Sequence, residues 1–220
     1  MPKLLRIGVL ASGGGTNLQS IIDRCQDGSL ATEIDLVISN NPSAGALVRA
    51  SRAGIQTLCI NHRDFCTREE FDTAVVKTLQ EAGVELVVLA GFMRIISQTF
   101  IDAFPERIIN IHPALLPAFP GLHVQQQAID YGARFSGCTV HFVDGGVDTG
   151  PIIIQAVVPV LPEDSAETLA TRILEQEHRV YPRAIQLIAE GRVRVDDRRV
   201  SIDPACPAEL TTLVNPSLNG

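Results

Sequence analysis

Short apolar runs alternate with stretches of helical periodicity over the first half of the chain. Apolar residues three and four apart recur at residues 17–26, 44–54 and 67–83, which predicts helices there. The runs around these segments are rich in Val, Ile and Leu and have the length of strands: residues 4–12, 33–40, 55–61, 85–91 and 107–112. Several are apolar throughout, which is typical of strands buried on both faces. The pattern predicts a doubly wound α/β fold, with a mostly parallel sheet and helices on both faces.

The pattern changes after residue 112. Residues 135–144 and 150–160 predict two more strands joined by a short glycine-rich turn, and hence an antiparallel extension of the sheet near its C-terminal end. Residues 165–191 predict one long helix. We expect this helix to be bent or interrupted near Pro182, because proline lacks the N–H that an inner helical turn needs.

The rest of the chain predicts a small appendage. Residues 192–203 have the pattern of a hairpin, and a tail with Pro and Asn follows. A chain of 220 residues without an internal repeat or a low-complexity linker suits one hydrophobic core. We therefore expect a single domain over residues 1–191 and a C-terminal hairpin and tail over residues 192–220.

The formal charge of the chain limits the partners it can have. The net charge is −7, and there is no dense run of Lys or Arg. Binding to nucleic acid depends on a basic face that neutralises phosphates, so we expect no nucleic-acid partner. A small anionic ligand stays possible, because a loop of backbone amides can bind phosphate in an acidic protein.

The cysteines and the N-terminus predict a cellular compartment. The five cysteines are scattered, without a C-x-x-C or zinc-ligand spacing, and His62, His123 and His178 have no metal-ligand spacing either. The apolar start of the chain is short and breaks on glycines, unlike a signal peptide or a membrane span. We expect a cytoplasmic protein with reduced thiols, no metal and no membrane contact, either a monomer or a homodimer.

The first candidate for chemistry is "ASGGGTNL" at residues 11–18, between the first strand and the first helix. Exposed backbone amides at a helix N-terminus suit a phosphate group. A dinucleotide site is disfavoured, because Leu18 stands where G-x-G-x-x-G needs its third glycine and the second strand ends in Asn40. The prediction is a monophosphate site, and the alternative is a tight turn without a ligand.

The second candidate is "NIH" at the end of the fifth predicted strand. Side chains alternate along a strand, so Asn110 and His112 should point to the same side. The carboxyl ends of parallel strands are where open α/β sheets bind ligands. An amide and an imidazole there suit acyl transfer, with donation to an oxyanion and movement of a proton. The alternative is a hydrogen-bonded strand end.

Two carboxylates follow in the glycine-rich turn "HFVDGGVDTGP" at residues 141–151. Asp148 could accept a hydrogen bond from His112 and stabilise its charged form. Aspartates in loops more often cap turns, which is the alternative for both Asp144 and Asp148. His141 is expected to belong to the preceding strand.

The fourth candidate is "LAGFMRIIS" at residues 89–97, where a strand ends in glycine. An apolar lip with one arginine suits a flat heteroaromatic ligand, although these residues could also be core. A phosphate turn, an apolar slot, Asn-x-His and a following Asp together indicate two substrates that meet at an acyl-transfer centre.

These segments resemble a known family. "ASGGGTNLQSII", "LAGFMRIIS", "NIHPALLPAFPGLH" and "VHFVDGGVDTGPII" occur in the order seen in formyltransferases that use 10-formyltetrahydrofolate, which have a Rossmann-like fold. The glycine-rich opening and the chain length resemble most the folate-dependent phosphoribosylglycinamide formyltransferases, or glycinamide ribonucleotide transformylases. The likeness covers about residues 5–190. It implies formyl transfer from 10-formyltetrahydrofolate, as cosubstrate, to glycinamide ribonucleotide in purine synthesis.

The resemblance also implies roles for individual residues. The catalytic residues would be Asn110, His112 and Asp148. The residues that bind the ribonucleotide would be Gly15, Thr16, Asn17 and Glu177. The residues that bind the folate would be Arg68, Met93, Arg94, Ile95, Ile96, Asn110, Asp144, Gly145, Gly146, Val147 and Asp148. Four positions depart from the usual pattern of the family: Ala114, Gln125, Gly145 and Leu174.

Other functions remain as alternatives. A formyltetrahydrofolate deformylase would use water as acceptor and normally carries an N-terminal regulatory domain, for which we expect no room before a strand that starts at residue 4. A methionyl-tRNA formyltransferase would need a further C-terminal domain and a basic surface. A non-catalytic ribonucleotide-binding module could use the same fold.

Overall fold

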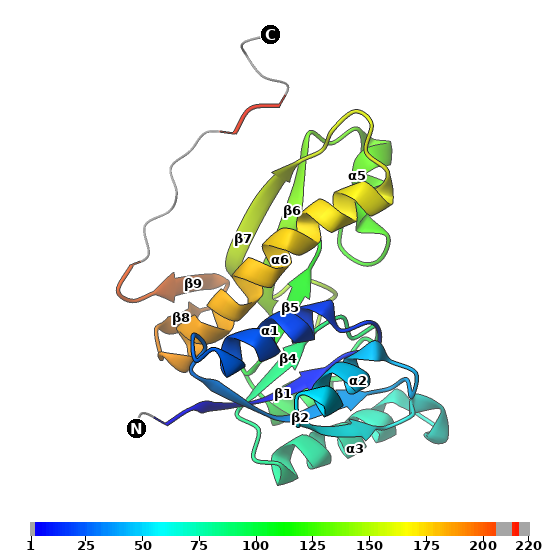
Figure 1. The fold of residues 1–220 in the computed structure, drawn as a ribbon, viewed down its shortest axis with the longest axis vertical. Helices are drawn as coiled ribbons and strands as arrows, with labels where there is room; N and C mark the ends of the chain where they lie inside the picture. Colours follow the sequence, from blue (N-terminus) through cyan, green and yellow to red (C-terminus); the bar gives the residue numbers. More distant parts are fainter. Residues whose placement is uncertain (1–2, 206–212, 216–220) are drawn as a thin grey trace.

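The computed structural model describes residues 3–205 and 213–215, and its centre is a seven-stranded sheet (Figure 1). The strands are β1 (Leu5–Leu10), β2 (Thr32–Ser39), β3 (Gln56–Cys59), β4 (Leu86–Leu89), β5 (Ile108–His112), β6 (Phe135–Phe142) and β7 (Ile152–Pro159). Their order in the sheet is β3-β2-β1-β4-β5-β6-β7. The first five strands run parallel, and β6 is antiparallel to both β5 and β7. The predicted doubly wound sheet with an antiparallel extension is confirmed.

Helices connect the strands: α1 (Thr16–Gln26), α2 (Gly45–Arg52), the 3-10 helix η1 (His62–Asp64), α3 (Arg68–Glu81), α4 (Gln98–Ala103), α5 (Val124–Tyr131) and α6 (Ala166–Ala189). The hydrophobic pattern did not predict α4 and α5. Each has eight residues or fewer, too few for a clear helical period.

The long helix is not interrupted at Pro182, because α6 continues through this residue. The side chains of Tyr181 and Pro182 are both buried against the sheet. The Tyr181 hydroxyl lies 2.9 Å from the carbonyl oxygen of Leu89 and 3.2 Å from that of Ile109. This packing outweighs the one helical hydrogen bond that proline removes.

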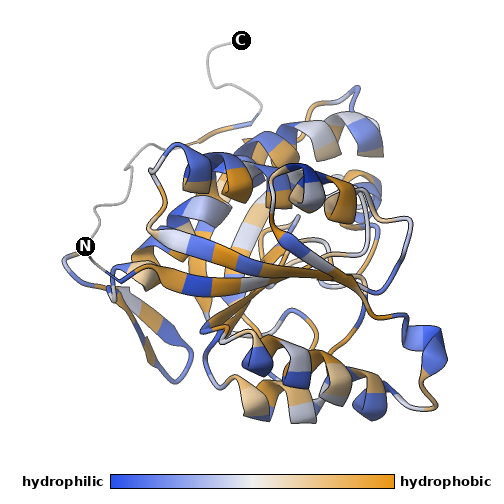
Figure 2. Ribbon diagram, turned by 60° about the horizontal axis from the view of Figure 1, so that its bottom comes forward, coloured by the Kyte–Doolittle hydropathy of each residue, from blue (hydrophilic) through white to orange (hydrophobic). Residues whose placement is uncertain are grey.

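Two apolar layers form the core, one on each face of the sheet (Figure 2). On β1, Ile7 and Val9 belong to the layer that includes α1, α2 and α6, whereas Leu10 belongs to the layer that includes α3 and α4. This alternation is the period of two that a strand imposes, and it explains why the central strands are apolar throughout.

The strand order reverses between β1 and β4, which are neighbours at the centre of the sheet. The loops that follow these two strands leave the sheet side by side, because the Ser12 N–H donates to the carbonyl of Gly91 at 3.0 Å. Such a switch point opens a crevice at the carboxyl ends of the strands. The candidate segments of the sequence all converge on this edge.

A hairpin follows the long helix. It consists of β8 (Val193–Asp196) and β9 (Arg199–Ile202), and β9 packs against β7 (Figure 1). Further on, the Asn215 side chain donates to the carbonyl oxygens of Arg134 and Val160. The remainder of the predicted tail, residues 206–212 and 216–220, lies outside the described residues. The division of the chain at residue 191 stays a prediction.

Candidate active site

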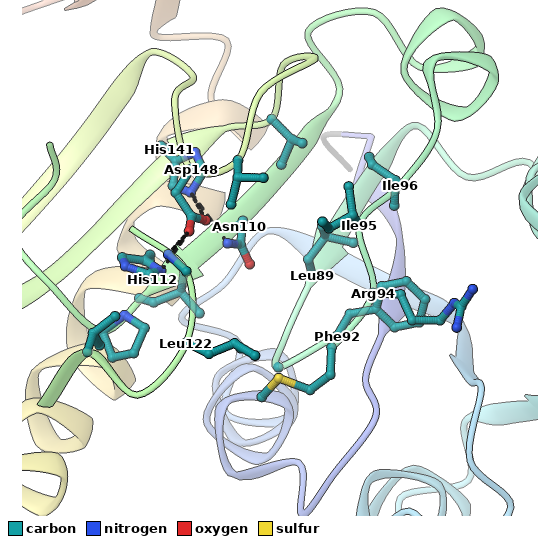
Figure 3. A pocket seen from close by; sticks show the side chains of 18 of the residues that line it. Leu89, Phe92, Arg94, Ile95, Ile96, Asn110, His112, Leu122, His141 and Asp148 are labelled. Atoms are coloured by element: carbon teal, nitrogen blue, oxygen red, sulfur yellow. Dashed lines mark hydrogen bonds and ion pairs between the residues drawn. The ribbon is translucent and has the colours of Figure 1, made fainter. Parts of the chain in front are cut away.

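A cavity of about 540 Å³ opens at the carboxyl ends of β4 and β5 (Figure 3). Its walls are the loop after β4, the proline-rich loop after β5, the end of β6 and the turn between β6 and β7. Asn110 and His112 both line it, as the alternation of side chains along β5 predicts. A concave, largely apolar site with a few convergent polar groups is typical of small-molecule sites.

His112 has an acceptor at each ring nitrogen and is only 4% exposed. Its Nδ1 lies 3.3 Å from Oδ2 of Asp148, and its Nε2 lies 2.9 Å from the carbonyl oxygen of Phe119. The protonated ring satisfies both acceptors at once, because only then does each nitrogen carry a proton. The predicted pairing of His112 with Asp148 is confirmed, and it suits an imidazole that donates.

Asp148 adopts a left-handed backbone conformation, with φ 55°. A residue with a Cβ pays about 1–2 kcal/mol for that conformation. The backbone N–H of Gly121, from the proline-rich loop, donates to Asp148 Oδ2 at 2.9 Å. The same oxygen therefore faces both His112 and Gly121, and the strained backbone aims it there.

Asp144 has a different task from Asp148. Its Oδ1 accepts from the Gly146 N–H at 3.1 Å and from the Thr149 hydroxyl at 2.5 Å. These bonds close the turn on itself. Asp144 therefore caps the turn, which was the alternative for both aspartates, whereas Asp148 contacts His112.

His141 belongs to β6, as expected, but it also lines the cavity. The antiparallel register pairs it with Asn110, and its Nε2 lies 3.4 Å from Asn110 Nδ2. Its Nδ1 is 2.8 Å from the carbonyl oxygen of Phe142, which can only accept. Burial lowers the pKa of His141, although the Phe142 carbonyl and the charge of Asp148 act in the opposite direction.

A neutral His141 with its proton on Nδ1 presents the Nε2 lone pair to the Asn110 amide. One N–H of that amide is then held by His141, and the other stays available to the cavity. The strand pattern alone did not reveal this contact, because it depends on the register between β5 and β6.

The loop after β4 forms an apolar lip at the mouth of the cavity. Met93 and Ile95 are 70% and 60% exposed, which is unusual for such side chains. The Arg94 guanidinium lies 5.0 Å above the ring of Phe71. Ile96 is buried in the core, so the segment is part core and part exposed lip, and the binding of a flat ligand to this lip stays a prediction.

The glycine turn between β1 and α1 exposes backbone amides. Gly15 has φ 75° and precedes the first helical residue, Thr16. The N–H groups of Gly13, Gly14 and Gly15 donate to no group in the described part of the chain. Amides in this arrangement favour an anion, so the turn retains its interpretation as a phosphate site.

Asn17 and Glu177 lie together, although 160 positions separate them. Asn17 Nδ2 donates to Glu177 Oε2 at 2.7 Å, and the Asn17 Oδ1 atom is buried without a partner in the described residues. Glu177 is 6% exposed, and burial raises the pKa of its carboxyl, against the opposing effect of the Asn17 hydrogen bond. Two residues predicted for the ribonucleotide thus form one polar pair beside the glycine turn.

Two residues of this region were not among the candidates predicted from the sequence. The Arg49 Nε donates to the carbonyl of Gly14 at 2.8 Å and so ties α2 to the glycine turn. The Ser12 hydroxyl donates to Asn40 Oδ1 at 2.6 Å and accepts from the Met93 N–H at 2.9 Å, so it links the glycine turn to the apolar lip. Ser12 could have been suspected from its place in the turn, but Arg49 is distant in sequence.

Some predicted residues lie outside the cavity wall. Arg68 and Gly145 do not line the cavity, and the Arg68 guanidinium is 3.2 Å from Glu69. Among the departures from the family pattern, Gln125 lines the cavity, Ala114 is fully buried and Leu174 is half-buried. The folate role of Arg68 and Gly145 stays a prediction.

The described residues also bear on metal binding and on membrane insertion. Residues 3–205 and 213–215 contain no group of three His, Cys, Asp or Glu side chains that could hold a metal ion. Among the helices of this described part, none combines the length and the apolar character that a membrane span requires.

The chain is similar to proteins of known family. Residues 5–185 match the family described as formyl transferase. Phosphoribosylglycinamide formyltransferase of Haemophilus influenzae is 45% identical over 198 residues, which cover 90% of this chain and 93% of that protein. The crystal structure of glycinamide ribonucleotide transformylase 1 from Symbiobacterium toebii has a TM-score of 0.90 and 52% identity, and the match covers 92% of this chain and 95% of that one.

Other relatives are much longer. The trifunctional purine biosynthetic protein adenosine-3 of Drosophila melanogaster is 50% identical over 188 residues. This match covers 84% of the present chain but 14% of that protein, so the chain spans only a small part of such relatives.

Proposed function

The chain belongs to the formyl transferase family, which matches residues 5–185, and from this premise we propose that it is a phosphoribosylglycinamide formyltransferase. It transfers the formyl group of 10-formyltetrahydrofolate to the amino group of glycinamide ribonucleotide, N1-(5-phosphoribosyl)glycinamide, in de novo purine (IMP) biosynthesis. Membership of the family implies a folate-type formyl donor. That the donor is 10-formyltetrahydrofolate and the acceptor is glycinamide ribonucleotide is our proposal. Two relatives of similar length carry matching names and support it.

One observation carries the proposal. The pair of His112 and Asp148, with Nδ1 and Oδ2 3.3 Å apart, stands beside Asn110 in a cavity that the apolar lip borders, and Ser12 joins this lip to the amide-lined turn. A phosphorylated acceptor on one side and a flat donor on the other would meet at these three side chains. This arrangement favours group transfer between two bound substrates.

The reaction begins when the amine nitrogen of the ribonucleotide attacks the formyl carbon. A tetrahedral intermediate forms, and its oxygen carries negative charge. Asn110, through its free N–H, and protonated His112 donate to this oxygen. His112 Nε2 now donates to Phe119, so the substrate oxygen would take the place of that carbonyl.

Asp148 completes the catalytic group. Its carboxylate stabilises the protonated ring of His112 and helps remove the proton that the attacking amine must lose, through a water molecule. The C–N bond to the folate then breaks, and the leaving nitrogen takes up a proton. The formyl group remains on the glycinamide amine.

The two substrates bind on opposite sides of this centre. Gly15, Thr16 and Asn17 hold the phosphate, and Glu177 accepts a hydrogen bond from the ribose. The folate ring lies against the lip of Met93, Arg94, Ile95 and Ile96. The turn formed by Asp144, Gly145, Gly146, Val147 and Asp148 covers its other side, and Arg68 lies farther out.

In two alternatives the formyl group is not transferred to the ribonucleotide. A deformylase would pass the formyl group to water and would have no use for a phosphate site, so the exposed amides at Gly13–Gly15 favour the ribonucleotide. A binding module without turnover would have no use for the pair of His112 and Asp148.

The test follows the loss of the formyl group from 10-formyltetrahydrofolate, with and without glycinamide ribonucleotide. Loss that requires the ribonucleotide is the expected result. Equal loss without it would establish a deformylase instead. Binding of the ribonucleotide with no loss in either mixture would leave the binding module.

Three further points complete the proposal. The protein works on small molecules, without nucleic acid, in the cytoplasm. It acts as a monomer or a homodimer. It needs no metal, because the chemistry is supplied by side chains and the folate.

A further inference from the structure

The C-terminal hairpin reaches the turn that carries Asp148. Its two strands are joined by Asp197 and Arg198, and the Arg198 guanidinium donates from Nη2 to the carbonyl oxygen of Thr149 at 2.8 Å. Thr149 directly follows Asp148 in the chain. The hairpin therefore contacts the backbone of the turn at the residue next to the carboxylate that faces His112.

Apart from the contacts of the Asp148 carboxylate with Gly121 and His112, the turn has few other ties to the described part of the molecule. Residues 145–147 and Thr149 are exposed, and two of these are glycines. The bonds from Gly146 and Thr149 to Asp144 stay within the turn. The backbone is fixed again only after it, where the Phe142 N–H donates to the carbonyl of Pro151 at 2.9 Å.

The geometry at Asp148 makes the position of Thr149 important. Asp148 has φ 55°, a conformation that is strained for a residue with a Cβ and persists only where the surrounding backbone is held. The carbonyl that accepts from Arg198 belongs to the next residue along the chain. A shift of about 1 Å at a reacting group can cost 10²-fold in rate, so a small rotation here would matter.

We propose that Arg198 is a positioning residue for catalysis, which holds the 144–149 turn through the Thr149 carbonyl so that Asp148 stays against His112. This inference rests on the proposed formyl transfer. It gives the hairpin a function in the reaction, although neither of its strands lines the cavity.

Arginine suits this task better than a shorter side chain. Its guanidinium offers five donors in a rigid plane at the end of a long stem, so it can bridge from the hairpin to a backbone carbonyl. Its charge also strengthens the hydrogen bond. A lysine could reach the same oxygen, but with one ammonium group on a flexible stem in place of a rigid planar fork.

The test uses the full chain with Arg198→Ala and Arg198→Lys. Arg199→Ala is the matched control, because Arg199 is the next residue of the hairpin, is exposed and makes no side-chain hydrogen bond to any described residue. We expect Arg198→Ala to lower kcat about tenfold, Arg198→Lys to recover part of the loss, and Arg199→Ala to match wild type. The KM for the ribonucleotide should stay within about twofold in all three, because the phosphate turn is elsewhere.

A double-mutant cycle with Asp148→Asn separates positioning from a general structural effect. If Arg198 acts through Asp148, adding Arg198→Ala to Asp148→Asn should change the residual kcat less than about twofold. The same tenfold loss in both backgrounds would overturn the inference, and so would wild-type kcat in Arg198→Ala or an equal loss in Arg199→Ala. An inactive wild type would overturn the proposed function itself, together with this inference. An active wild type beside an unaffected Arg198→Ala would overturn the inference alone.

Discussion

Asn110 and His112 reach one cavity because they stand two apart on β5, and their neighbours decide what each can do. Asp148 and the Phe119 carbonyl surround the imidazole with acceptors. His141, kept neutral by burial, holds one N–H of the Asn110 amide. The centre therefore places two donors where a tetrahedral oxygen would develop, and this oxygen replaces the Phe119 carbonyl as the partner of His112 Nε2.

The first residue-scale prediction concerns this centre. His112→Ala and Asp148→Asn should each lower kcat by a factor of about 10² to 10³, because each removes a donor or the charge that supports one. The melting temperature of each variant should stay close to that of wild type. Steady-state kinetics and thermal unfolding measure both effects. Wild-type turnover in either variant would contradict the assignment of these residues.

The second prediction concerns Glu177. Burial raises the pKa of its carboxyl, so the folded chain binds a proton more readily there than the unfolded chain does. The stability of the protein should therefore fall as the pH rises from the ordinary glutamate range through the raised pKa. Glu177→Gln removes this titrating group. We expect its free energy of unfolding to exceed that of wild type at pH 8, and we expect this difference to become smaller toward pH 5.

Urea unfolding at a series of pH values measures this margin. Glu175→Gln is the control, because Glu175 is exposed on the same helix. A difference between Glu177→Gln and wild type that is the same at every pH would contradict the prediction. Ribonucleotide binding should weaken in Glu177→Gln, since a neutral amide replaces the acceptor proposed for the ribose.

At the scale of elements, the sequence allows the central sheet to be predicted and much of the site with it. Apolar runs mark β1 to β5, and helical periodicity marks α3, whose first turn is capped by Thr67, which accepts from the Glu70 N–H. The contact of His141 with Asn110 depends on strand register, and that of Arg198 with Thr149 joins residues 49 positions apart. Such contacts follow from tertiary packing and have no local pattern in the sequence.

The glycine turn gives a prediction at this scale. Gly15 has φ 75°, and a Cβ there would lie 2.6 Å from Cα of Ala46 on α2. Gly28 has φ 77° with nothing within 4 Å, so it is a matched control. Gly15→Ala and Gly28→Ala should each lower the free energy of unfolding by about 1–2 kcal/mol, because alanine is strained in the left-handed conformation.

Only Gly15→Ala also pushes the turn away from α2. We expect it to be the less stable of the two variants and to raise the KM for the ribonucleotide tenfold or more, roughly the loss of one charge-assisted hydrogen bond. Unfolding curves and initial rates measure these effects. Equal stabilities and an unchanged KM would show that the turn does not hold the phosphate.

At the scale of the whole molecule, the topology separates the two substrates. The strand order reverses between β1 and β4, and the loops after these strands form the amide-lined turn and the apolar lip. The Ser12 hydroxyl connects the two loops through the Met93 N–H, and it also donates to Asn40 at the end of β2. The reacting groups of β5 and of the β6–β7 turn lie at the same edge of the sheet as these two loops. This arrangement explains how one sheet can bring the formyl donor and the formyl acceptor together.

This separation predicts independent effects on the two substrates. Asn17→Ala should raise the KM for the ribonucleotide about tenfold and leave the KM for the folate unchanged. Ile95→Ala should raise the KM for the folate about fivefold, because it removes apolar surface from the lip. In the double variant both changes should appear undiminished, since the sites share no side chain. A KM effect that crosses from one substrate to the other would contradict the separation.

The most direct test of the account traces the formyl carbon itself. The purified protein is mixed with 10-formyltetrahydrofolate labelled with carbon-13 in the formyl group and with glycinamide ribonucleotide, and the products are followed by nuclear magnetic resonance. The account predicts that the label appears on the amine of the ribonucleotide, at a rate that falls by about 10² or more in Asp148→Asn. Label released as free formate, with the ribonucleotide unchanged, would contradict it.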